Sequence, residues 1–125
     1  MSVINLPTTA AQREARAEKA FNLAERYRVT AKEWAEAEAA AGLLEETKGA
    51  VLAELSLQAG AGSIAGADRI AKASPAWREH LTAMVEARRK ANLKKVHLKY
   101  IEMIFYTRQG ADADRRAELR LTGGA

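Results

Sequence analysis

The chain has no cysteine, only two prolines, and few aromatic residues, which make up 6% of its 125 residues. The absence of cysteine excludes disulfide bonds and thiolate metal sites, and it is typical of a reducing compartment such as the cytoplasm. Alanine, glutamate, lysine, arginine and leucine predominate instead, while β-branched residues are scarce. This composition predicts an all-α protein in which alanine supplies much of the helix packing.

Long hydrophobic runs are also missing. No segment approaches the roughly 18 apolar residues of a membrane span, and the first residues contain no apolar core of signal-peptide length. We therefore expect a cytoplasmic protein with no membrane association. The length predicts a single domain, 1–125, with flexible ends at residues 1–8 and 111–125.

Two long helices dominate the predicted fold. One runs over 75–109, between the capping residue Ser74 and Gly110, which we place just beyond the helix end. The other runs over 31–58, where apolar residues recur at alternating three- and four-residue steps. The glycine-rich segment 59–66 separates them, and Ser63 is predicted to cap a short helix through Ala73. These elements predict an elongated antiparallel helical hairpin or coiled coil.

An additional N-terminal helix is predicted over 10–28, capped by Thr8 or Thr9. The next boundary carries the spacing of a capping box, in which Thr30 and Glu33 satisfy each other's free backbone donors. We therefore favour a turn at Thr30. The alternative is one continuous helix with a kink.

The densest charge in the chain lies in the middle of the predicted helix 75–109, with no acidic residue between Glu86 and Glu102. Such a strip of cations can follow a phosphate backbone, and Tyr100 or Tyr106 can stack on bases. We therefore predict contacts to single-stranded or duplex DNA from this cluster. The candidate nucleic-acid-binding residues are Arg88, Arg89, Lys90, Lys94, Lys95 and Lys99.

The same cations have competing partners inside the predicted hairpin. A register in which paired residue numbers add up to about 134 places acidic side chains of the other helix beside the cluster. The predicted neighbours are Glu46 with Arg88, Glu45 with Arg89, Glu38 with Val96, and Glu36 with Leu98, within reach of Lys95 and Lys99. Up to four of the six charges would then be neutralised internally, so the sequence leaves a structural and a binding interpretation open.

Other patterns do not predict a site. The glycines of 60–66 lack the lysine and Ser/Thr of a phosphate-binding loop. His80 and His97 lie too far apart on one helix to share a metal. The paired carboxylates Glu36/Glu38 and Glu45/Glu46 are typical of a solvated helix face. We therefore predict a protein that is not an enzyme, with no catalytic residue, no metal and no cofactor.

The order of parts resembles that of small all-helical proteins encoded in the early recombination and replication regions of tailed phages and prophages. The resemblance covers roughly residues 17–110: Phe21 in an N-terminal helix, an alanine- and glutamate-rich helix from Trp34 to Leu57, a break before Ser74, and a long helix that ends with residues 105–109, FYTRQ. That group carries no assigned activity, so no residue role is transferred. The resemblance implies a phage or prophage origin and work near DNA recombination, single-strand handling or host interference.

The functional hypothesis is a non-catalytic phage accessory protein whose basic helix binds nucleic acid or assists a DNA recombination or replication partner. The alternative is a protein–protein inhibitor or scaffold that acts on a host defence protein through an acidic surface. That surface comprises Glu33, Glu36, Glu45 and Glu46. Because the alanine-rich seam is narrow and the apolar residues of 100–106 lack a partner, we also predict a homodimer or a larger homo-oligomer.

Overall fold

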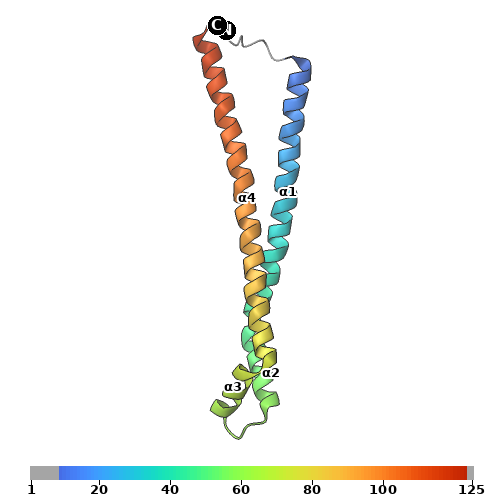
Figure 1. Ribbon diagram of the computed structural model, residues 1–125, viewed down its shortest axis with the longest axis vertical. Coiled ribbons are helices and arrows are strands. Elements are labelled where there is room, and N and C mark those ends of the chain that lie inside the picture. Colours follow the sequence, from blue (N-terminus) through green and yellow to red (C-terminus); the bar gives the residue numbers. More distant parts are fainter. Residues whose placement is uncertain (1–8, 124–125) are drawn as a thin grey trace. The chain divides into compact units, whose positions relative to one another are not determined.

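A computed structural model describes residues 9–123, and four helices account for nearly all of them (Figure 1). The helices are α1 (Ala10–Glu46), α2 (Lys48–Ala59), α3 (Ile64–Ala73) and α4 (Pro75–Leu121). The described part contains no strand, so the predicted all-α class and the helical hairpin are confirmed. Residues 1–8, predicted to be flexible, lie outside the described part. Over the described residues, no helix has both the length and the apolar character needed to cross a membrane.

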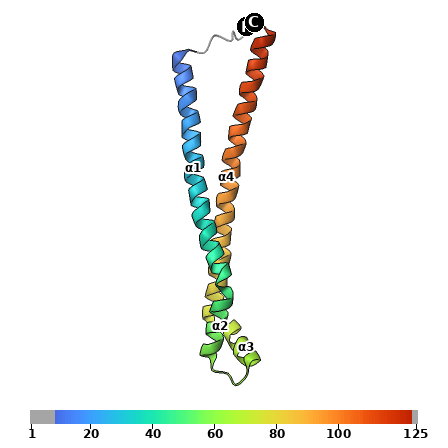
Figure 2. The same ribbon diagram turned by 180° about the vertical axis from the view of Figure 1, so that it is seen from behind.

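The contacts divide the chain into two compact units. Unit 1 consists of residues 1–30 and 98–125, and unit 2 consists of residues 31–97. Inside unit 2, α1 packs against α4, and α3 folds back against α2 (Figure 2). Inside unit 1, the first part of α1 faces the last part of α4, and the two draw apart toward their free ends.

Helix α1 begins at a reciprocal cap. The Gln12 backbone N–H donates to Thr9 Oγ1 at 3.1 Å, and the Thr9 backbone N–H donates to Gln12 Oε1 at 2.9 Å. The predicted turn at Thr30 is wrong, because α1 continues without a break through this residue to Glu46. Thr30 is buried, and Glu33 forms an ion pair with Lys94 of α4 instead of capping a helix. The capping pattern therefore begins a helix at Thr9, whereas tertiary packing overrides the same pattern at Thr30.

The interruption in the first limb lies at Thr47, between α1 and α2. Thr47 Oγ1 donates to the Leu43 carbonyl at 2.7 Å, a bond that competes with regular helix geometry. Lys48, a polar defect in the predicted apolar seam, places its Nζ 5.9 Å from the centroid of the Trp77 ring. A cation over an aromatic face explains how this lysine is accommodated.

The two limbs of unit 2 are joined by a short turn and the helix α3. Gly60 ends α2 in the left-handed conformation, with φ of 64°. Ser63 caps α3 as predicted, since its Oγ accepts from the Gly66 backbone N–H at 3.1 Å. Ser74 then serves two helices, because its Oγ donates to the Ala71 carbonyl at 2.6 Å and accepts from the Trp77 backbone N–H at 3.2 Å. Pro75 follows as the first residue of α4, as predicted.

The predicted end of α4 at Gly110 is wrong, because the helix continues to Leu121. A Cβ at Gly110 would meet no atom within 4 Å, and the residue lacks the positive φ of a helix cap. Glycine costs only about 1 kcal/mol in a helix interior, so one glycine between good helix formers does not stop the helix. Residues 111–121 are thus helical rather than an irregular tail.

The core is narrow and consists largely of small residues. In unit 2, Ala37 and Ala41 of α1 pack with Ala91 of α4, and Ala87 packs against this cluster. In unit 1 the buried hydrophobic side chains are Leu23, Leu98 and Ile101. Alanines allow the two helices to approach closely and bury little apolar area for each residue. The arrangement leaves many larger hydrophobic side chains exposed.

Candidate nucleic-acid interface

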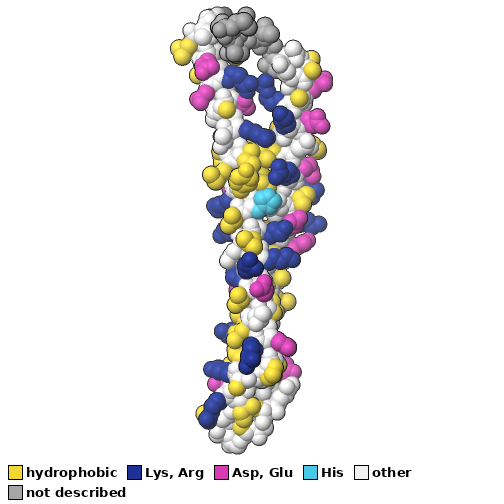
Figure 3. Space-filling view, viewed as in Figure 1, with side chains coloured by type: hydrophobic (Ala, Val, Ile, Leu, Met, Phe, Trp, Pro, Cys, Tyr) yellow, Lys and Arg dark blue, Asp and Glu magenta, His cyan; other side chains and the backbone are white. Residues whose placement is uncertain are grey.

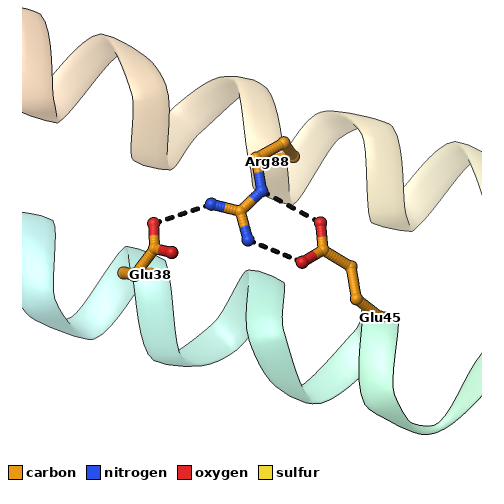
Figure 4. A network of polar contacts seen from close by, with 3 residues as sticks. All are labelled: Glu38, Glu45 and Arg88. Atoms are coloured by element: carbon orange, nitrogen blue, oxygen red, sulfur yellow. Dashed lines mark hydrogen bonds and ion pairs between the residues drawn. The ribbon is translucent and has the colours of Figure 1, made fainter.

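Arg88 is held between two carboxylates of α1 (Figure 4). Its Nε and Nη2 donate to the two oxygens of Glu45 at 2.9 and 2.6 Å, and its Nη1 donates to Glu38 Oε2 at 2.7 Å. These bonds raise the pKa of Arg88 above its ordinary value, and the bond from Arg88 lowers the pKa of Glu45. Arg88 is therefore a structural cation, with all three of its guanidinium nitrogens engaged by carboxylates of α1.

Lys94 is committed in a similar way. Its Nζ donates to Glu33 Oε2 at 2.5 Å, across unit 2. The hydrogen bond from Lys94 lowers the pKa of Glu33, and the charges of His97 and Lys90 act in the same direction. Two of the six predicted contact residues, Arg88 and Lys94, thus neutralise carboxylates of α1 and are not directed at a ligand.

The observed register differs in part from the predicted one. Arg88 was predicted beside Glu46 and contacts Glu45, one residue away. Glu38 was predicted beside Val96, yet it also contacts Arg88, and Glu33, predicted to cap with Thr30, was not assigned a partner on the other helix. The predicted register treats the whole of 59–74 as the connection between the two limbs. In the structure, α3 folds back against α2 soon after Gly60. The return limb therefore starts earlier along the chain than the predicted register assumed.

The remaining cations of the cluster lie on the surface. Arg89 is 70% exposed, and its one ion pair among residues 9–123 is with Glu86, at 4.0 Å on the same helix. Lys90 and Lys95 are exposed, and neither forms a hydrogen bond or ion pair with a side chain of the described residues. Lys99 is also exposed but belongs to unit 1. Of the predicted contact residues, unit 2 thus presents three outward cations, Arg89, Lys90 and Lys95.

An apolar strip accompanies these cations on α4. Val85, Leu93 and Val96 are each more than half exposed. Together with Arg88, Arg89 and Asn92 they line a shallow depression of about 370 Å³. A helix face of this kind has both cationic and apolar contacts to offer a partner.

The predicted acidic surface is smaller than expected. Glu33 and Glu45 are held by Lys94 and Arg88, so their charges are largely compensated inside unit 2. Glu36 and Glu46 remain exposed. His80 is half-buried, stacks on Trp77 and lies 3.2 Å from the Leu44 carbonyl through Nε2. It contacts a carbonyl in the last turn of α1, which Thr47 Oγ1 also approaches at 3.4 Å.

The sequence did not predict a groove of about 750 Å³ in unit 1, between α1 and α4. Figure 3 shows hydrophobic side chains gathered where these helices face each other, with Lys and Arg side chains toward the free ends. Tyr27 donates to Glu102 Oε1 at 3.0 Å, and this bond to a carboxylate raises the pKa of the phenol. The groove is lined by Arg16, Lys19, Ala20, Leu23, Ala24, Tyr27, Ile101, Glu102, Phe105, Tyr106, Arg108, Gln109, Ala111, Asp112 and Arg115.

Only the pairing of the two helices could have indicated this groove, because its residues are far apart in sequence. Comparisons with protein-family models, with curated proteins and with solved structures gave no match to this chain. Two surfaces of the chain offer binding chemistry: the outward cations of unit 2 and the groove of unit 1.

Proposed function

We propose that this chain is a non-catalytic accessory protein of phage or prophage origin that binds nucleic acid through the exposed cations of α4. In this proposal it serves DNA recombination or replication in the cytoplasm of a bacterial host and works as a homo-oligomer. The supporting observation is that Arg89, Lys90 and Lys95 lie exposed on a stretch of helix that has no carboxylate between Glu86 and Glu102. Their ammonium and guanidinium groups remain available for phosphate oxygens.

The internal ion pairs reduce the number of cations that can contact phosphate groups. Arg88 and Lys94 hold the hairpin together, which leaves three of the five predicted contacts of unit 2, namely Arg89, Lys90 and Lys95; the sixth predicted contact, Lys99, belongs to unit 1. Three phosphate contacts give a log–log salt slope of about −2 on single strands and about −3 on duplex, whereas six would give about −4 and about −5. The measured slope therefore reports how many cations the hairpin leaves available.

A fluorescence anisotropy titration tests the proposal. The titration uses a labelled oligonucleotide at about 50 mM salt and at several higher concentrations, where phosphate contacts weaken steeply. We expect salt-dependent binding that the Arg89/Lys90/Lys95→Glu triple variant abolishes. The control is the Lys32/Arg69/Arg78→Glu triple, which makes the same change in net charge at exposed positions of unit 2. No binding by the native chain, or equal loss in both triple variants, contradicts the proposal.

A second candidate is the protein–protein inhibitor or scaffold that acts on a host protein. The observation that favours it is the exposed strip of Val85, Leu93 and Val96, because nucleic-acid phosphates make no use of an apolar strip. The Val85/Leu93/Val96→Ser variant separates the two candidates. It retains oligonucleotide binding if the cations carry the function. If the apolar strip carries the function, the variant no longer captures a protein partner that the native chain retains after nuclease treatment.

A further inference from the structure

Two outward faces of unit 2 carry the charges that the hairpin leaves without partners. On α1, Glu36 and Glu46 are exposed, and neither forms an ion pair among residues 9–123. On α4, Lys90 and Lys95 are exposed and equally unpaired over the same range, and Arg89 has a single 4.0 Å ion pair within its own helix. One helix is thus left with carboxylates to pair and the other with cations.

The cationic face of α4 lies on the other side of this helix from the alanine cluster. Ala87 and Ala91 pack toward α1, whereas the residues on the outward side recur at steps of four, three and four, the spacing of a coiled-coil seam. These outward residues are Val85, Arg89, Asn92 and Val96. All of them are exposed, and with Arg88 and Leu93 they line the shallow depression of about 370 Å³. The outward side of α4 is therefore a second seam that nothing in the described chain covers.

Helix α1 has an outward seam of the same spacing. Ala37 and Ala41 belong to the buried cluster, and the residues on the other side of the helix recur at steps of three, four and three. These outward residues are Glu36, Ala39, Leu43 and Glu46. All of them are exposed, and Leu43 exposes 63% of its surface. This seam has apolar residues in its middle and a carboxylate at each end.

We propose that the outward seam of α4 in one copy of the chain packs on the outward seam of α1 in a second copy. The inference rests on the self-association in the proposed function and assigns it two surfaces. Apolar residues of one seam then cover apolar residues of the other, and Arg89 meets a carboxylate. That carboxylate is Glu36 if the two helices run parallel and Glu46 if they run antiparallel, because each alignment keeps the steps of both seams in phase.

A contact of α4 with α4 does not fit these charges. It brings Arg89, Lys90 and Lys95 of both copies together, and the nearest carboxylate on the helix is Glu86. Like charges that face each other oppose association, whereas the seam of α1 supplies the opposite sign. A contact between two different faces leaves each copy with one free face, so copies add one after another into a ring or an open chain.

Two variants that each block one face test the contact. Val96→Asp disables the α4 seam and leaves α1 intact, and Leu43→Asp does the reverse. Sedimentation velocity from about 5 to about 200 µM, well into the range of weak specific association, is expected to show assemblies larger than a dimer for the native chain and monomers for each variant alone. An equimolar mixture is expected to give a one-to-one dimer and nothing larger, because one intact α4 seam meets one intact α1 seam.

Leu57→Asp is the matched control, since Leu57 is exposed on α2 and belongs to neither seam. It is expected to assemble like the native chain, and circular dichroism checks that every variant is as helical as the native chain. A native chain that stays monomeric over the whole range overturns the contact. So does a mixture of the two blocked variants that stays monomeric, or a blocked variant that still assembles alone.

Charge exchange identifies the carboxylate that Arg89 meets. Arg89→Glu is expected to weaken assembly at least about tenfold, because two carboxylates then face each other. Adding Glu36→Arg to this variant restores assembly if the helices run parallel, and adding Glu46→Arg restores it if they run antiparallel. Failure of both double variants to assemble overturns the pairing of the two seams.

The same samples separate this contact from nucleic-acid binding, since both use Arg89. A native chain that assembles and binds no labelled oligonucleotide contradicts the proposed nucleic-acid function and leaves the contact supported. A native chain that binds the oligonucleotide and stays monomeric overturns the contact and leaves the nucleic-acid function supported. An oligonucleotide that dissociates the native assembly supports both, because phosphate groups and the second copy then compete for the same face of α4.

Discussion

Arg88 donates two hydrogen bonds to Glu45, from Nε at 2.9 Å and from Nη2 at 2.6 Å, and so links α4 to the last turn of α1. A two-pronged contact of this kind fixes both the direction and the register of the paired helices. Its third donor reaches Glu38, so one guanidinium holds two turns of α1. This relationship explains why the most prominent basic helix of the chain is first of all a structural element.

Removal of Arg88 should therefore destabilise the hairpin more than removal of its neighbour. We expect Arg88→Ala to lower the denaturation midpoint clearly, because Glu38 and Glu45 lose their shared partner. Arg89→Ala is the matched control, since Arg89 is 70% exposed and its one ion pair among the described residues is with Glu86. Urea denaturation followed by circular dichroism measures both. Equal midpoints for the two variants would sink the structural role of Arg88.

Acid should weaken the hairpin through the same carboxylates. Lys94 and Arg88 hold the pKa values of Glu33 and Glu45 below their ordinary value of 4.5. The unfolded chain therefore takes up protons at these groups first as the pH falls, and folding becomes less favourable. Stability from these pairs is fully present above about pH 5 and is lost as the pH falls through the lowered pKa values.

Denaturation midpoints measured from pH 7 to pH 3 test this direction. The Glu33/Glu45→Gln double variant should be less stable at neutral pH and should show a shallower loss of stability on acidification. Glu36/Glu54→Gln is the control, because neither carboxylate forms an ion pair among the described residues. A double variant that keeps the native pH profile shows that these ion pairs do not link folding to protonation.

The alanine seam should not tolerate a larger side chain. Ala91 is 0% exposed and packs with Ala37 and Ala41 where α1 and α4 approach closely. We expect Ala91→Leu to cost about 1–3 kcal/mol of unfolding free energy, because the helices must move apart or strain the new side chain. Ala83→Leu on the exposed face of the same helix should stay within about 0.5 kcal/mol of the native chain. Denaturant titration decides, and a tolerated leucine at 91 would mean that the seam is loosely packed.

The turn at Gly60 should depend on glycine. Its φ of 64° lies in the left-handed region, where a Cβ collides with the following carbonyl oxygen. We expect Gly60→Ala to cost about 1 kcal/mol. Gly62→Ala, two residues on and without a positive φ, should be close to neutral. Thermal unfolding of both variants measures the difference, and equal melting temperatures would contradict a strained backbone at Gly60.

The sequence by itself determined the elements whose signals are local. Ser63 and Ser74 cap the helices that follow them, and Pro75 starts α4, because these effects depend only on the backbone groups of one helix turn. The all-α class and the two-limbed hairpin follow from composition and from apolar periodicity, which neighbouring residues set. The presence of a basic cluster from Arg88 to Lys99 could also be read directly from the chain.

Only the tertiary structure decided which of those signals prevail. Thr30 has the same capping potential as Thr9, yet it is buried inside a continuous helix. Lys94 looks like a free cation in the sequence, and its partner Glu33 lies 61 residues away. The groove of unit 1 exists because α1 and α4 draw apart, a result of packing between distant segments that no local pattern records. Local chemistry thus sets where helices begin, and the contacts between them set where they continue and which charges remain available.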